Sequence, residues 1–197
     1  MSTLLVDAIQ DSDGAGPKAT LPASGGSNFT LGPNWGALEF VSVTSISAVT
    51  NIDITGLAAG YDYSICIRGA IPATDDTDVE VQFSQSTTFD TGANYSTRSV
   101  ASQSSITVCN ASASVGNAAD EGVSLDLTIP EPNVGSRKKF AWADGASSYT
   151  DGVGYPFAGK GGAYDANLNA VDGVRLFWSS GDWQAAGKIY VFRRRLS

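Results

Sequence analysis

The stretch Tyr61-Asp62-Tyr63-Ser64-Ile65-Cys66-Ile67-Arg68 places an apolar residue at every second position. Successive side chains of a β-strand point to opposite faces of a sheet, so this alternation predicts a strand with one apolar and one polar face. Cys66 falls on the polar face, together with Asp62, Ser64 and Arg68. We therefore expect one face of this strand to lie in a core and the other to face solvent.

The same alternation recurs along the chain, between segments rich in Gly, Asn and Asp that favour turns. It predicts eight further strands, around residues 38–40, 52–54, 79–83, 106–108, 123–129, 140–142, 174–178 and 189–191. The last two are expected to form a hairpin through the loop 179–186, which contains Gly181. Short, half-polar strands at this spacing predict an all-β fold, an antiparallel β-sandwich of jelly-roll type.

Alternation also predicts where four notable side chains lie. Trp142 and Trp178 belong to the apolar sets of their strands and are expected in the core. Cys66 and Cys109 belong to polar faces, away from the main core. Two cysteines are too few for a disulfide framework, so we expect reduced thiols.

The first 34 residues differ in composition from the rest of the chain. Asp11–Asn34 is rich in Gly, Ser, Pro, Asp and Asn, which is typical of a linker. Ser2–Gln10 resembles a short apolar strand without a hairpin partner, and such a strand usually pairs with another element or another chain. We predict an extended attachment arm and linker over residues 1–34 and a β-sandwich domain over 35–197. The candidate attachment residues are Leu4, Leu5, Val6 and Ile9.

Charge and hydropathy argue against several partners. The formal net charge of −8 disfavours nucleic acid, because phosphate binding needs concentrated Lys and Arg. The basic runs Arg137–Lys139 and Arg193–Arg195 are expected to be solvated strand ends, although the second is also suited to a neighbouring subunit's acidic surface. No stretch approaches the roughly 20 apolar residues of a membrane span, and the N-terminus has no signal-peptide pattern. We expect a soluble chain, made in the cytoplasm, with no membrane insertion.

Catalysis and metal binding find little support in the residue types. The absence of histidine removes Ser-His-Asp and Cys-His catalysis and His-based zinc sites. Paired carboxylates alone can hydrolyse glycosides, but the clusters Asp75–Asp78 and Asp120–Glu121 and the single Glu131 fall in turn-like stretches. Asp75–Asp78 and Asp11–Gly14 offer oxygen ligands for calcium without completing an EF-hand loop. We predict no enzyme activity, no catalytic residue and no cofactor.

Aromatic residues in polar loops suggest sugar binding instead. Flat rings stack on the apolar faces of sugars, and loops carried by a rigid sandwich are common binding sites. Trp183 lies in the loop 179–186, while Tyr149 and Tyr155 lie in the Gly-rich stretch 144–164. These three residues are the candidate glycan contacts.

Several short segments that encode strands and turns can be compared with known families: Ile54–Leu57, Tyr61–Ile65, Ile71–Asp75, Val79–Ser84, Thr88–Tyr95, Ala170–Asp182 and Gly187–Phe192. Together they resemble virion proteins of tailed bacteriophages that sit in tail fibres or spikes. The opening Ser2–Asp11 is similar to the N-terminal segment of many fibre-like phage proteins. The resemblance implies an arm anchored to the particle, followed by a sandwich, and a homotrimer. It carries no catalytic motif.

Two main functions remain open on these grounds. The first is a fibre or spike subunit that joins other virion proteins, of the capsid, neck or tail, through its arm and presents its loops to a host-surface glycan. The alternative is a capsid decoration or cement protein that clamps neighbouring coat subunits. A polysaccharide-degrading enzyme is the less favoured third. In each case we expect the chain to be located in the virion.

Overall fold

The computed structural model describes residues 8–10, 17–20, 30–31, 38–97, 100–109, 115–148 and 154–196. These residues form strands and connecting turns, and every strand pair is antiparallel. Within these ranges no helix has the length and apolar character needed to cross a membrane.

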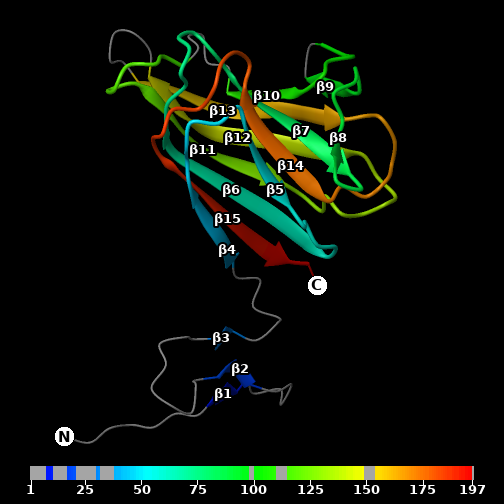
Figure 1. The fold of residues 1–197 in the computed structure, drawn as a ribbon. Coiled ribbons are helices and arrows are strands. Elements are labelled where there is room, and N and C mark those ends of the chain that lie inside the picture. The colour runs from blue at the N-terminus through cyan, green and yellow to red at the C-terminus, as the bar shows by residue number, and fades with distance from the viewer. Residues whose placement is uncertain are drawn as a thin grey trace, which may run out of the picture.

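Two sheets pack face to face and form a β-sandwich, as predicted (Figure 1). The larger sheet has seven strands, in the order β4 (Leu38–Ser45), β15 (Lys188–Arg195), β6 (Tyr61–Ala70), β11 (Gly122–Ile129), β12 (Lys139–Ser148), β13 (Gly154–Tyr164) and β9 (Tyr95–Thr97). The smaller sheet has the order β10 (Ile106–Cys109), β7 (Val79–Gln85), β14 (Gly173–Trp178) and β5 (Asn51–Thr55), with β8 (Thr88–Phe89) paired to β7.

The chain crosses repeatedly from one sheet to the other, as in a jelly roll. From β4 to β7 each strand lies in the opposite sheet to the one before it, and the same holds from β8 to β11. Alternating residues of each strand therefore face a shared interior. Ile65 and Ile67 of β6 and Leu127 of β11 are fully buried there, against Val81 and Leu176 of the smaller sheet.

A third, smaller sheet precedes the sandwich. It consists of β1 (Ala8–Gln10), β2 (Pro17–Thr20) and β3 (Thr30–Leu31), which among the described strands pair with one another and with no strand of the sandwich. β2 and β3 were not predicted, because residues 11–34 have the composition of a linker. Ile9, a candidate attachment residue of the predicted arm, lies in β1. Leu4, Leu5 and Val6 lie outside the described residues.

The prediction that β14 and β15 form a hairpin is wrong. β14 pairs with β5 and β7 in the smaller sheet, whereas β15 lies between β4 and β6 in the larger one. The segment 179–187 therefore passes from one sheet to the other. Trp183 forms a bridge with Pro72 along this path, and its backbone N–H donates to the carbonyl of Val49 over 2.9 Å.

The predicted faces of β12 are reversed. Lys139, Ala141 and Ala143 point to the interior, whereas Phe140 and Trp142 are 45% and 38% exposed on the outer face. β10 of the smaller sheet packs close to β12 and β13, so at Ala141 and Ala143 the inner face of β12 has room only for small side chains. The expectation that Trp142 is a core residue is therefore wrong, while Trp178 of β14 is buried as predicted.

A bulge changes the position of Cys109. The register between β10 and β7 shifts between Thr107 and Cys109, which pairs with Val79. Strict alternation ends at such a shift, so Val108 and Cys109 are both fully buried. Cys109 thus belongs to the core, contrary to the prediction, whereas Cys66 lies on the outer face of β6 as predicted.

Both basic runs are bonded within the chain. Lys139 is buried, and its ammonium group donates to the carbonyls of Val134 and Arg137. Burial and the nearby Arg137 charge lower the pKa of Lys139. At the other end of the chain, the guanidinium groups of Arg193 and Arg194 bind Glu39 at 2.8 Å and Asp62 at 2.9 Å.

Candidate functional site

The three predicted glycan contacts do not come together. Trp183 is fully buried and packs against Trp178 with ring centroids 4.8 Å apart, so its indole is not available to a sugar and that prediction is wrong. Tyr155 is half-buried on β13, opposite the buried Ser147. Tyr149 lies outside the described residues.

The acidic loop between β6 and β7 is organised by a hydroxyl group. Thr77 is buried, and its hydroxyl lies 2.8 Å from that of Ser179 and 3.0 Å from the backbone N–H of Ser180. Asp75 and Asp76 remain exposed. In the described part of the chain, no three His, Cys, Asp or Glu side chains gather as a metal site would require.

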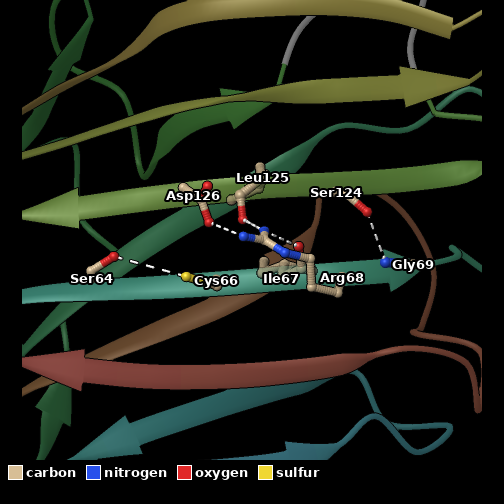
Figure 2. Close-up of polar contacts among 8 residues, drawn as sticks. All are labelled: Ser64, Cys66, Ile67, Arg68, Gly69, Ser124, Leu125 and Asp126. Atoms are coloured by element: carbon tan, nitrogen blue, oxygen red, sulfur yellow. Dashed lines mark hydrogen bonds and ion pairs between the residues drawn. The ribbon is translucent and has the colours of Figure 1, made fainter. Parts of the chain in front are cut away.

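The outer face of the larger sheet carries an ion pair at its centre. Arg68 of β6 binds Asp126 of β11 at 2.5 Å, and its guanidinium also donates to the carbonyls of Ile67 and Leu125, each over 2.9 Å (Figure 2). Next to this pair, the backbone N–H of Gly69 donates to the hydroxyl of Ser124. These bonds join the two strands through side chains as well as through the backbone.

Cys66 lies beside this ion pair and is half-buried. Burial raises the pKa of the Cys66 thiol above its ordinary value, and the carboxylate of Asp126 raises it further, against smaller opposing effects of Ser64 and Arg68. A raised pKa keeps the sulfur protonated and unreactive at neutral pH. The environment therefore does not favour a nucleophilic or redox role for Cys66.

A polar hollow lies at the end of the sandwich that carries β8, a strand labelled on the right of Figure 1. Its volume is about 580 Å³. Three segments line it: the end of the β7–β8 hairpin, the loop after β8, and the end of β13 with the loop that follows. The lining residues are Gln85, Thr88, Phe89, Asp90, Thr91, Gly92, Asn94, Tyr164, Ala166 and Asn167.

Asp90 is held in this hollow by three donors, two from its own loop and one from the end of β13. Its Oδ1 atom accepts from the backbone N–H of Gly92 over 2.8 Å, and its Oδ2 atom accepts from Asn94 over 2.9 Å and from the phenol of Tyr164 over 2.7 Å. Burial raises the pKa of Asp90, but the three hydrogen bonds together outweigh it and leave the pKa below its ordinary value. The carboxylate is therefore ionised and fixed in direction.

A cluster of buried aromatic residues next to the hollow holds the backbone of Asp90 as well. Tyr95 is fully buried, donates its phenol to the carbonyl of Asp90 over 2.9 Å and accepts from the backbone N–H of Phe83 over 2.9 Å. Its ring lies 4.9 Å from that of Tyr164, which in turn lies 5.8 Å from Phe83. Packing and hydrogen bonding thus hold Asp90 by both its side chain and its main chain.

The β7–β8 hairpin forms one wall with a strained turn. Ser86 and Thr87 both have positive φ, at 52° and 68°, a conformation that a β-branched residue such as Thr rarely adopts. The carboxylate of Asp172 holds the turn, because it accepts from the Ser84 hydroxyl over 2.6 Å and from the Thr87 backbone N–H over 3.1 Å. Gln85 and Thr88, on either side of this turn, both line the hollow.

The remaining wall combines amides with an aromatic ring. Gln85 and Asn167 exchange two hydrogen bonds between their side-chain amides, over 2.7 Å and 3.1 Å. The ring centroid of Phe89 lies 4.2 Å from the guanidinium carbon of Arg175. The Arg175 guanidinium group in turn donates two hydrogen bonds to the carboxylate of Asp53. In the sequence, Thr88–Tyr95 contributed only to the resemblance to phage proteins, and the hollow that residues of this segment line was not predicted.

Comparison with known proteins adds no relative. No family model matches the chain, and neither curated proteins nor solved structures give a match. A function is therefore proposed from the fold, the hollow and the sequence patterns.

Proposed function

We propose that this chain is a structural subunit of a virion, of the fibre or spike type, that joins the particle through its N-terminal segment and presents its sandwich outward. The observation that carries the proposal is the division of the strands. In the described part of the chain, β1–β3 pair with one another, and β4–β15 form both sheets of the sandwich without them. A segment that the sandwich does not use in its sheets is available for other virion proteins. The sequence resemblance to tail fibre and spike proteins supports the same role.

The test is to separate assembly from folding. A variant lacking residues 1–34 is expected to give a folded, soluble domain that no longer joins particles. A full-length variant with Leu5→Asp and Val6→Asp should behave in the same way, whereas one with Thr20→Ser and Thr30→Ser should assemble normally. Quantitative mass spectrometry of purified phage particles measures incorporation. Normal incorporation of the truncated chain would contradict the proposal.

A capsid decoration or cement protein is the second candidate, and the edge strand β4 favours it. Leu38, Phe40, Val41 and Val43 are all exposed large apolar residues on this strand, whose only described neighbour is β15. An apolar edge strand that stays uncovered promotes association with other chains, so a lateral contact in an assembly would explain it. Such a contact also fits the homotrimer that the sequence resemblance implies.

Copy number distinguishes the two candidates. Hundreds of copies in each particle indicate a decoration protein that covers the capsid, whereas a few trimers indicate a fibre or spike. A low-resolution reconstruction of the intact particle, compared with one that lacks this chain, would show the number and the location together.

A further inference from the structure

We infer that the polar hollow around Asp90 binds an uncharged hexose residue at the end of an oligosaccharide. The inference rests on the proposed function for the source of the sugar, a host-surface glycan, but the ligand class follows from the hollow alone. It replaces Trp183 as the place where the sandwich would contact a glycan, since that side chain is buried.

The hollow has a suitable size and position for such a ligand. A volume of about 580 Å³ lies within the range of small-molecule sites. It is built at the end of the sandwich from three segments, each attached to a β-strand of the core. A rigid scaffold that carries polar groups on connecting loops is a common arrangement for recognition.

Asp90 provides a fixed acceptor for sugar hydroxyl groups. Its Oδ2 atom accepts two hydrogen bonds from Asn94 and Tyr164, whereas its Oδ1 atom accepts one from Gly92. Counting bonds to the described residues, Oδ1 therefore retains an acceptor position. Because the carboxylate is already oriented by the protein, a ligand would not have to order it, and preorganisation of this kind favours affinity.

The amide pair provides both donors and acceptors. After the bonds that Gln85 and Asn167 exchange, the amide of Gln85 keeps one N–H and one lone pair among its described contacts, and that of Asn167 keeps one N–H. A sugar hydroxyl donates and accepts at the same time, so it matches such a mixed set. The half-buried ring of Phe89 adds an apolar surface for the C–H face of a sugar.

Charge selects against acidic ligands. The lining contains the carboxylate of Asp90 and no Lys or Arg, while Arg175 lies against Phe89 and is neutralised by Asp53. A phosphate or a uronic acid would place like charge against Asp90, which is unfavourable. An uncharged, polyhydroxylated ligand fits both the hydrogen-bonding groups and the charge.

The experiment uses the purified full-length chain and ¹⁵N-labelled side-chain amides observed by NMR. The probes are the methyl glycosides of glucose, galactose, mannose, rhamnose and N-acetylglucosamine, with methyl glucuronide and inorganic phosphate as charged counterparts. At least one neutral glycoside is expected to cause saturable shifts, at millimolar concentration, that include the amides of Gln85, Asn94 and Asn167. The shifts should be unchanged when EDTA is present.

Two variants and one control locate the binding. Asp90→Asn and Asn167→Ala are each expected to weaken binding by about tenfold or more, which is the loss of one good hydrogen bond in a binding site. Asn167→Ala leaves the bonds of Asp90 intact, so it remains informative if Asp90→Asn fails to fold. The control is Asp126→Asn, the same chemical change on the outer face of the sheet, which should bind as the unmodified chain does.

Three outcomes would overturn the inference. They are the absence of shifts with every neutral glycoside up to tens of millimolar, binding of glucuronide or phosphate in place of the neutral sugars, and binding that requires calcium. None of them bears on particle incorporation, which is measured separately. Conversely, if the chain binds a hexoside but is absent from virions, the sugar site is supported and the proposed virion function is contradicted.

Discussion

The phenol of Tyr164 donates a 2.7 Å hydrogen bond to the carboxylate of Asp90, although the two residues lie 74 positions apart in the sequence. Tyr164 ends the longest strand of the larger sheet, and Asp90 begins the loop after β8 of the smaller one. This hydrogen bond thus links the two sheets at the hollow, together with the bonds of Tyr95 to Asp90 and Phe83. Removal of the Tyr164–Asp90 hydrogen bond should change both the free energy of unfolding and the way that this free energy depends on pH.

Tyr164→Phe is expected to lower the free energy of unfolding by about 1.5–3 kcal/mol, the usual range for a hydrogen bond to a charged group. Because the pKa of Asp90 is below its ordinary value of 3.8 in the folded chain, its bonds stabilise the fold above that pH, and this contribution is lost as the pH falls through the folded value. The difference between variant and unmodified chain should therefore shrink in acid. Urea denaturation at neutral and strongly acidic pH measures it, and a difference that does not change with pH would contradict the assignment.

Trp183→Ala should be among the most destabilising single changes in the chain. The side chain is fully buried against Trp178, and truncation of such a residue costs about 3–5 kcal/mol through lost contacts and the cavity that remains. Trp142→Ala is the matched control, because it removes the same side chain from an exposed position and should cost less than about 1 kcal/mol. Equal losses in urea denaturation would mean that the buried and exposed tryptophans are wrongly assigned.

Asp126→Asn should make Cys66 more reactive. The change removes a negative charge that raises the pKa of the Cys66 thiol, so the pKa falls and more thiolate is present at mildly alkaline pH. Alkylation by iodoacetamide, followed by mass spectrometry, should therefore be faster at Cys66 than in the unmodified chain. Cys109 is fully buried and serves as the internal control, since it should react in neither protein while folded. A slower reaction at Cys66 would contradict the electrostatic explanation.

Thr87→Gly should stabilise the β7–β8 turn. A non-glycine residue with φ of 68° carries strain of about 1–3 kcal/mol, part of which glycine relieves at some cost in chain entropy, so a gain of roughly 1 kcal/mol is expected. Thr88→Gly, in the adjacent extended strand, should instead lower stability. Thermal unfolding of the two variants provides the comparison, and a loss in both would show that the turn is not strained.

Val43→Lys should weaken self-association if β4 supplies a contact between copies of the chain. Val43 is 50% exposed on the edge strand, and a lysine on such an edge opposes pairing with another chain. Val100→Lys changes an equally apolar residue that is 48% exposed outside β4, and it should leave association unchanged. Sedimentation velocity measures both, and an unaltered oligomer in the Val43→Lys variant would exclude β4 from the contact.

Alternation predicted the position of nine strands, and all nine are present. In strands such as β6 and β11, one-sided burial imposes the same period on sequence and structure. It could not show which face of β12 is the inner one. Either Phe140 and Trp142 or the small residues between them could face the core, and the larger apolar side chains pointed to the wrong choice. The closeness of β10, which favours small residues there, is a tertiary property.

β13 escaped prediction for a different reason. Its sequence from Gly154 to Tyr164 is rich in glycine and shows no apolar alternation. Two of these glycines are required by close neighbours, since a Cβ atom at Gly161 would overlap the carbonyl oxygen of Ala141, and one at Gly162 that of Ser96. Such approaches depend on strands far away in the sequence. The hollow was missed likewise, because Asp90, Tyr164 and Asn167 meet only when both sheets have formed.

The place of β15 has a consequence for the order of events during synthesis. β15 is the last of the described strands in the sequence, yet it lies between β4 and β6 (Figure 1). β4 is the first sandwich strand to leave the ribosome, and its one sheet neighbour among the described strands is not made until β15 emerges. A premature stop that removes β15 would therefore take away the strand that covers β4 in the described sheet and leave its apolar residues open to other chains.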